Sequence, residues 1–212
     1  MFTGIVQHVG VIASVTPTDT GVRLTLDPAG WDHAPARGDS IACNGCCLTL
    51  ADEPRPGQPW CFDAIPETLA KTTLGAWSEG TRVNLEHAAT MATLLGGHLV
   101  QGHVDGVGEV LGVETGEGWR VRVGLPAALM PYAVPKGSIA LEGVSLTLAA
   151  VEPRGGWIEV ALIPETLTRT TLGALKPGDP VNIEMDQAAK TIVHWLENFA
   201  EQRGLRGLSR AD

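Results

Sequence analysis

The residues best suited to chemistry are a thiol and a hydroxyl at matching places in two similar segments. Cys47 lies in Asn-Gly-Cys-Cys-Leu-Thr, and Ser145 lies 98 residues later in Glu-Gly-Val-Ser-Leu-Thr. Either group can add to an electrophilic carbon, or activate water to do so, when a base takes its proton. A histidine in a β segment is more often structural, but His103, close to Asp105, is our candidate base because imidazole titrates near neutral pH.

These two segments belong to an internal repeat with a constant offset of 98 residues. The string Ile-Pro-Glu-Thr-Leu-x-x-Thr-Thr-Leu-Gly occurs at 65–75 and again at 163–173, and residues 4–10 match 102–108. Solenoid units repeat every ~20–50 residues, so a period this long corresponds to a whole domain. We therefore predict two domains of one fold, 1–97 and 98–186, followed by a tail of different character.

The elements that must position these residues are short strands. Apolar and polar residues alternate in 22–26 and in 119–123, which is typical of half-buried strands. The constant offset would pair Val22 with Arg120, so we expect a one-residue shift that a nearby loop absorbs. Short antiparallel strands punctuated by glycine and proline close most simply into small barrels, because closure removes exposed edges.

Helical structure is predicted at three places. Pro-Glu-Thr-Leu at 66–69 and 164–167 indicates a helical turn with proline first and an acid in its first turn. In the tail, Asp186 is placed to cap a helix that ends near 203. Its apolar stripe lies either on the chain's own barrels or against copies of itself in an oligomer, and consists of Ala189, Ile192, Leu196 and Phe199. Residues 204–212 are expected to be a mobile end.

Composition excludes several classes of protein. Hydrophobic residues make up 44% of the chain and charged residues 18%, which is incompatible with disorder. The net charge is −9 and no basic cluster occurs, so nucleic-acid binding is not expected. No apolar run reaches the ~18–20 residues of a membrane span, and no positive residue precedes Arg23. A cytoplasmic protein is expected.

The four cysteines are expected to be free thiols, because reducing compartments disfavour disulfides. Cys43-x-x-Cys46-Cys47 with Cys61 has partial zinc-type spacing. Adjacent residues on a strand face opposite ways, so Cys46 and Cys47 cannot easily bind one metal ion. We expect no metal site.

The best-matched strings indicate ligand sites. They are rich in glycine, threonine and other polar residues, whereas packing alone would tolerate hydrophobic exchange. Two equivalent small-ligand sites, one per barrel, would explain them; the alternative is that they are only turn and cap residues of a repeated fold. The two halves differ at equivalent positions: Cys47 corresponds to Ser145, and Ile5 corresponds to His103. The two sites would therefore treat the same molecule differently.

Several motifs together resemble the riboflavin synthase family over roughly residues 1–200. They occur in the family's order: 1–6 (MFTGIV), 44–49 (NGCCLT), 96–98 with 102–105 (GGH, GHVD), 143–147 (GVSLT), the paired Pro-Glu-Thr-Leu strings, and 181–184 (VNIE) before Asp186. Cys43 departs from the residue that relatives often carry, and we interpret it as a packing variant. The resemblance implies an all-β fold of two tandem six-stranded Greek-key barrels, and a C-terminal helix at 187–203 that assembles a homotrimer.

The resemblance also implies an activity. Each barrel would bind one 6,7-dimethyl-8-ribityllumazine, and the reactive pair would form where the N-terminal barrel of one subunit meets the C-terminal barrel of its neighbour. One lumazine would give four carbons to the other, yielding riboflavin and 5-amino-6-(D-ribitylamino)uracil without a metal or redox cofactor. Association with lumazine synthase stays open. The rivals are a lumazine protein acting as an optical antenna, and a flavin carrier or structural trimer.

The site residues follow from the resemblance. The N-terminal barrel site would comprise Gly4, Ile5, Val6, Cys47, Leu48, Thr49, Asp63, Ala64, Ile65, Pro66, Glu67 and Thr68. The C-terminal barrel site would comprise Gly102, His103, Val104, Lys136, Ser145, Leu146, Thr147, Ala161, Leu162, Ile163, Pro164, Glu165 and Thr166. His103 would be the base or a proton relay, and Ser145 or Cys47 would act on the acceptor ring. Asp186 would position Ser145 or His103, and Phe2 would stack on or cover a ring.

Overall fold

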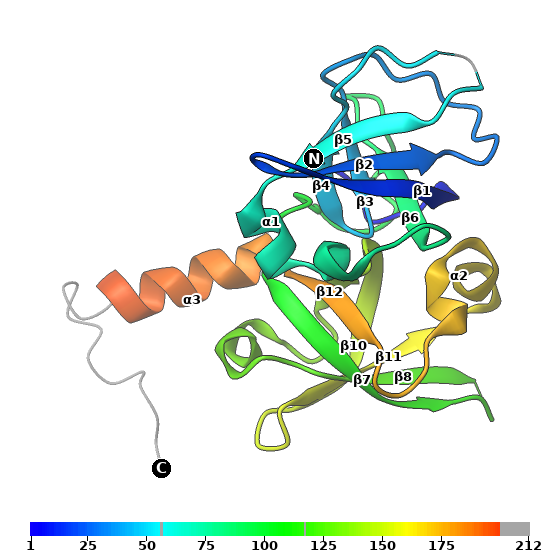
Figure 1. Ribbon diagram of the computed structural model, residues 1–212. Helices are drawn as coiled ribbons and strands as arrows, with labels where there is room; N and C mark the ends of the chain where they lie inside the picture. The colour runs from blue at the N-terminus through cyan, green and yellow to red at the C-terminus, as the bar shows by residue number, and fades with distance from the viewer. Residues whose placement is uncertain (56, 117, 200–212) are drawn as a thin grey trace.

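The computed structural model describes residues 1–55, 57–116 and 118–199. Two β domains lie one above the other, and a helix projects from the side of the pair (Figure 1). The expected end of the helix at 200–203 and the expected tail at 204–212 lie outside the described residues.

The N-terminal domain is a six-stranded antiparallel sheet in the order β4-β3-β6-β1-β2-β5. The end strands β4 and β5 meet through one isolated bridge, between Leu50 and Phe62. Its elements are β1 (His8–Thr18), β2 (Gly21–Asp27), β3 (Ser40–Cys43), β4 (Cys46–Thr49), β5 (Trp60–Ala64), α1 (Pro66–Lys71), η1 (Thr73–Ala76) and β6 (Arg82–His87).

The C-terminal domain is a closed barrel in the order β10-β11-β8-β7-β12-β9, with the same strand neighbours as its twin. The expected all-β fold of two tandem six-stranded units and a C-terminal helix is confirmed. The elements are β7 (Gly106–Glu114), β8 (Trp119–Gly124), η2 (Ala127–Tyr132), β9 (Ser138–Leu141), β10 (Val144–Glu152), β11 (Trp157–Leu162), α2 (Pro164–Arg169), η3 (Thr171–Ala174), β12 (Pro180–Met185) and α3 (Gln187–Phe199).

The predicted register shift is confirmed. Val15 of β1 pairs with Leu24, and its equivalent Val113 pairs with Val121. The offset is therefore 98 residues in the first strand of each domain and 97 in the second, so the hairpin loop between them absorbs the difference. Leu24 and Val121 are each 1% exposed, and both domains keep the same inward face.

The predicted helices are present. The helices α1 and α2 each begin with the predicted proline and carry a glutamate in the first turn. Asp186 caps α3 by accepting from the N–H groups of Ala188 and Ala189, at 2.8 and 3.2 Å. No side chain of α3 is buried, and Ile192 is 59% exposed. Among the described residues, no helix is long and apolar enough to cross a membrane.

The two domains contact each other through equivalent polar groups used twice. The Asn84 side chain donates to Glu142 O (2.9 Å) and accepts from Thr171 N–H (2.8 Å). Its twin Asn182 donates to Asn44 O (2.9 Å) and accepts from the N–H of Thr73 (2.7 Å). The halves are thus related by an approximate two-fold axis, and a small apolar cluster lies at the same interface, comprising Phe2, Ala42, Val100 and Ala140.

Candidate functional site

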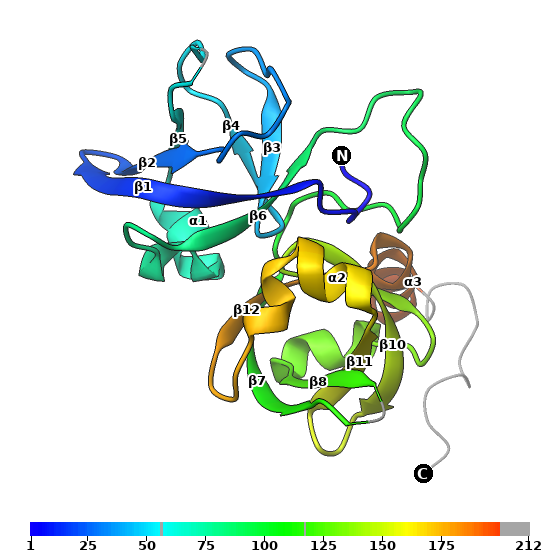
Figure 2. The same ribbon diagram turned by 90° about the vertical axis from the view of Figure 1, so that its right-hand side faces the viewer.

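Each domain is completed by a segment from the other, which we call the first arm (residues 2–6) and the second arm (100–104). Gly4 O accepts from the N–H of Ser145 at 2.7 Å, and Gly102 O accepts from the N–H of Cys47 at 2.8 Å. Val6 belongs to the core of the C-terminal barrel, whereas Val104 packs on the core of the N-terminal domain. The two arms run antiparallel beside each other, joined by a bridge between Phe2 and Val100. Figure 2 shows the segment before β1 lying between the two domains.

Glycine is required where the arms touch the opposite strands. Gly4 and Gly102 have φ of 73° and 78°, in the left-handed region. A Cβ on Gly4 would lie 2.5 Å from Ser145 Cβ, and one on Gly102 would lie 2.5 Å from Cys47 Cβ. The repeated Gly at the start of each half therefore serves a close backbone approach.

This exchange corrects the expected grouping of the site segments. Residues 4–6 were assigned with 47–49, but they lie beside Ser145 in the C-terminal domain. Residues 102–104 were assigned with 145–147, but they lie beside Cys47 in the N-terminal domain. The sequence does not distinguish an arm that packs on its own domain from one that packs on the other domain, because both halves carry equivalent segments.

A cavity of about 450 Å³ lies at the junction of the first arm and the C-terminal barrel. Such a volume is typical of sites for drug-sized ligands. Ile5 and Ile163, which are 47% and 62% exposed, offer apolar surface for a flat ring. Glu165 forms an ion pair with Arg169 along the α2 side. The remaining lining residues are Gly4, Val6, Gln7, Val144, Ser145, Thr166 and Thr170.

Ser145 is paired with a histidine that the sequence analysis did not select. His98 Nδ1 lies 2.7 Å from Ser145 Oγ. The backbone N–H of His98 donates to Thr3 O at 3.1 Å. Burial lowers the pKa of His98, and the negative charge of Asp186 opposes that shift. A neutral imidazole at this distance can accept the hydroxyl proton of Ser145.

His98 has no twin in the repeat, because with the offset of 98 residues its equivalent position would precede Met1. The signal that could have identified it is the double glycine before it. A Cβ on Gly97 would lie 2.2 Å from Thr3 O and 2.7 Å from Ser145 Cβ, so only glycine lets this segment approach the first arm and Ser145.

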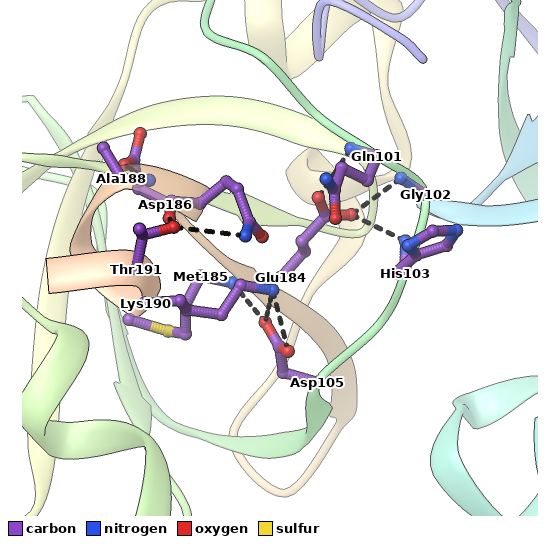
Figure 3. Close-up of polar contacts among 11 residues, drawn as sticks. Gln101, Gly102, His103, Asp105, Glu184, Met185, Asp186, Ala188, Lys190 and Thr191 are labelled. Atoms are coloured by element: carbon purple, nitrogen blue, oxygen red, sulfur yellow. Dashed lines mark hydrogen bonds and ion pairs between the residues drawn. The ribbon is translucent and has the colours of Figure 1, made fainter. Parts of the chain in front are cut away.

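The equivalent position in the N-terminal domain carries the Cys47 thiol, which is partly buried and faces the second arm. Its neighbour Cys46 lies in the domain core, where burial raises the thiol pKa to about 12. The two adjacent thiols thus face opposite ways, as expected for a strand. His103 is exposed on the second arm, and its backbone N–H donates to Glu184 at 2.9 Å (Figure 3). The cysteines of the described chain are free thiols.

Three of the expected functional side chains have different surroundings from those expected. Phe2 is 1% exposed and packs between the domains, so its ring presents no face to a ligand in this arrangement. Asp186 accepts from the first N–H groups of α3 and acts on His98 through its charge. The Asp105 carboxylate accepts hydrogen bonds from Lys190 Nζ, at 3.0 Å, and from the backbone N–H of Met185 (Figure 3).

Lys136 and Asp63 also stand apart from the two arms. Lys136 lies in the turn before β9 with φ of 65°, where the first half has Gly38 with φ of 91°. A lysine held in a conformation that favours glycine is a feature more typical of functional positions. Asp63 forms two 2.8 Å contacts with the Arg23 guanidinium, which lowers the pKa of its carboxyl.

The other expected site residues are divided between the two domain cores and the surface. The apolar members of the strings are buried in the two domain cores: Leu48, Ala64, Leu146 and Leu162. Thr49, Thr147 and Ala161 are exposed at the surface. Residues 65–68 and 163–166 form the starts of α1 and α2.

The fold and this geometry define a class: a protein of two tandem β domains with exchanged arms, in which equivalent positions beside the arms carry a thiol, Cys47, and a hydroxyl, Ser145. The family model described as Lumazine binding domain matches residues 3–88 and again 101–186. Riboflavin synthase of Mycobacterium tuberculosis is 43% identical over 194 residues, covering 91% of this chain and 96% of its own. That of Brucella abortus is 40% identical, covering 90% and 95%.

Solved structures agree with these sequence relatives. The crystal structure of LumP complexed with riboflavin has a TM-score of 0.78 at 28% identity, covering 88% of this chain and 100% of that one. The complex of LumP with 6,7-dimethyl-8-(1'-D-ribityl) lumazine has a TM-score of 0.76 at 27% identity, covering 87% and 99%. The chain therefore belongs to the riboflavin synthase family of lumazine-binding proteins.

Proposed function

We propose that the chain is a transferase that converts two molecules of 6,7-dimethyl-8-ribityllumazine into riboflavin and 5-amino-6-(D-ribitylamino)uracil. The observation that carries the proposal is that equivalent positions beside the two arms differ in chemistry: Ser145 pairs with His98 in the C-terminal domain, and Cys47 takes its place in the N-terminal domain. A reaction that treats two identical molecules differently needs such a pair. The two substrates together contain every atom of both products, so the transfer needs no oxidant or reductant.

The proposed binding sites follow the exchanged arms. One lumazine lies in the C-terminal domain against residues 4–6, 145–147 and 161–166, where the cavity is found. The other lies in the N-terminal domain against 47–49, 63–68 and 102–104. Backbone N–H and C=O groups and threonine hydroxyls would bind the pyrimidine edge and the ribityl chain. Lys136 stays a predicted contact.

The proposed chemistry begins with removal of a proton from the 7-methyl group of the donor lumazine, whose anion delocalises into the ring. His103, exposed on the second arm, is the proposed base or proton relay. In the C-terminal domain, His98 accepts the proton of Ser145 while the hydroxyl, or a water beside it, adds to the acceptor ring. The added oxygen is later eliminated from the ring and takes the proton back from His98. Holding the two rings together supplies an effective concentration that solution cannot.

We also propose that α3 assembles a homotrimer, in which the N-terminal domain of one protomer faces the C-terminal domain of the next. The support is the unburied apolar stripe of α3, with Ile192, Leu196 and Phe199 between 42% and 59% exposed. The free thiols of the described chain favour a cytoplasmic location. Association with lumazine synthase is to be tested by co-sedimentation.

The deciding experiment adds 6,7-dimethyl-8-ribityllumazine to the purified protein and follows riboflavin absorbance. We expect one riboflavin for every two lumazines consumed. His103→Gln and Ser145→Ala should each slow turnover strongly while leaving ligand binding within several-fold. A yellow, fluorescent complex without turnover would instead indicate an optical antenna or flavin carrier, and normal turnover by His103→Gln would remove that residue from the mechanism.

A further inference from the structure

Two buried carboxylates occupy equivalent places in the two domains and have no role in the chemistry above. Glu86 is the penultimate residue of β6, Glu184 is the penultimate residue of β12, and they are 4% and 3% exposed. Buried carboxylates are uncommon unless they are well paired. Their hydrogen-bond partners in the described chain lie in the two arms: backbone N–H groups and, for Glu86, also the Thr3 hydroxyl.

Each carboxylate accepts three hydrogen bonds from one arm or its flank. Glu184 accepts from the N–H groups of Gln101, Gly102 and His103 at 2.6, 2.9 and 2.9 Å (Figure 3). Glu86 accepts from the N–H and the hydroxyl of Thr3 at 2.6 and 2.7 Å and from the N–H of Gly4 at 3.0 Å. Each arm is therefore fixed on a strand of its own domain before it crosses to the other.

The opposite edge of the first arm holds the Ser145 site. Thr3 O accepts from the His98 N–H at 3.1 Å, and Gly4 O accepts from the Ser145 N–H at 2.7 Å. The same two residues that donate to Glu86 thus accept from both members of the His98–Ser145 pair. Because His98 and Ser145 are anchored to two different residues of this segment, a displacement of the segment shifts them by different amounts and changes the 2.7 Å distance between Nδ1 and Oγ.

A carboxylate suits this place better than its isosteric amide. Its two oxygens are acceptors only, and three donors point at them. A glutamine would turn an NH₂ group toward at least one of those donors, so the arm would have to shift. Burial raises the pKa of Glu86, and the hydrogen bonds from Thr3 and Gly4 oppose that shift by favouring the charged form.

We propose that Glu86 is a positioning residue for the His98–Ser145 pair, acting through Thr3 and Gly4, and that Glu184 positions the second arm against Cys47 in the same way. The inference rests on the proposed function, because that function makes the His98–Ser145 pair catalytic. It predicts a crossed effect: a carboxylate of the N-terminal domain governs the chemistry of the C-terminal domain.

The test compares Glu86→Gln with the matched variant Glu184→Gln in the full chain. The first readout is the titration of the His98 imidazole, followed by NMR on histidine-labelled protein. Loosening the first arm admits water, so Glu86→Gln should raise the His98 midpoint toward that of a free imidazole. Asp186, the charged group that faces His98 from the turn before α3, is unchanged in both variants. Glu184→Gln should leave the His98 titration at its wild-type position.

The second readout is turnover of 6,7-dimethyl-8-ribityllumazine. Glu86→Gln should lower kcat at least tenfold and change KM by no more than a few-fold, because the pocket walls stay in place. Glu86→Asp keeps the charge on a shorter side chain and should recover part of the loss. An unchanged His98 titration in Glu86→Gln, or an equal shift in both glutamine variants, would overturn the proposal.

Two further cases keep the test of Glu86 independent of protein folding and of the proposed function. If Glu86→Gln does not fold, Thr3→Val removes only the hydroxyl that donates to Glu86 and supports the Ile5 N–H. It should shift the His98 titration in the same direction by a smaller amount, and no shift would count against Glu86. If the wild-type protein makes no riboflavin, the proposed function fails, while the His98 titration still decides whether Glu86 positions the pair.

Discussion

Replacement of Glu142 by glutamine should make stability less dependent on pH. Glu142 lies in the two-residue turn between β9 and β10, is 5% exposed, and accepts from the Asn182 N–H at 2.6 Å. Burial raises the pKa of its carboxyl from 4.5 to about 8, against the opposing effect of the hydrogen bonds from Asn182 and Asn44. The folded protein therefore keeps a proton on Glu142 at a pH where the unfolded chain has released it.

The sign and size of the effect follow from this difference. The folded state binds more protons between pH 4.5 and about 8, so the free energy of unfolding falls as pH rises through that window. The loss is at most about 1.4 kcal/mol per pH unit, which gives a ceiling of roughly 5 kcal/mol at pH 9. Glutamine keeps the acceptor oxygen for the Asn182 N–H and has no proton to release.

The assay is denaturant unfolding of the wild type and Glu142→Gln at pH 5, 7 and 9. We expect similar stability at pH 5 and a gain of several kcal/mol for the variant at pH 9. Groups that titrate alike in both proteins, such as Glu86 and Glu184, cancel in the difference. A difference that is the same at every pH would refute the reasoning that the buried carboxyl is neutral in the folded state.

Three more predictions concern the arms, the domain interface and the helix. Gly4→Ala should lower the unfolding free energy by about 2–4 kcal/mol and weaken riboflavin binding, because it strains a left-handed residue and its Cβ would meet Ser145; calorimetry and fluorescence titration measure both. Asn182→Ala should cost about 2–4 kcal/mol in thermal unfolding, since the Thr73 N–H loses its acceptor and the domain interface loses a donor. Ile192→Glu should convert the proposed trimer into monomers in light scattering while the fold seen by circular dichroism is kept.

The repeat predicted much of the fold because a strand pattern and its turns are local. The constant offset and the alternation in 22–26 predicted two domains of one topology. The offset would pair apolar Val22 with Arg120, and this mismatch predicted the register shift that the hairpins show. The proline and acid at 66–67 gave α1, and its twin gave α2. These features depend on periodicity and capping, which the sequence records directly.

The site was less predictable because it depends on which copy of a segment fills which domain. Val6 and Val104 are equivalent in sequence, so nothing in the repeat indicates that each packs in the other domain. His98 was quoted only within the motif at 96–98 and was given no role, because comparison of the two halves gives it no counterpart. Phe2 was expected at a ligand, but an aromatic residue near a site motif packs between domains as readily as it stacks on a ring.

The crossing of the arms bears on how such a chain arose. At the approximate two-fold axis, Gly45 and Gly143 touch so closely that a Cβ on either would lie 2.7 Å from the amide nitrogen of the other. This is the arrangement of a symmetric dimer whose copies each lent their first residues to the partner. Fusion of two such genes would preserve the contact and free each copy to diverge, so that one ancestral residue could become Cys47 on one side and Ser145 on the other.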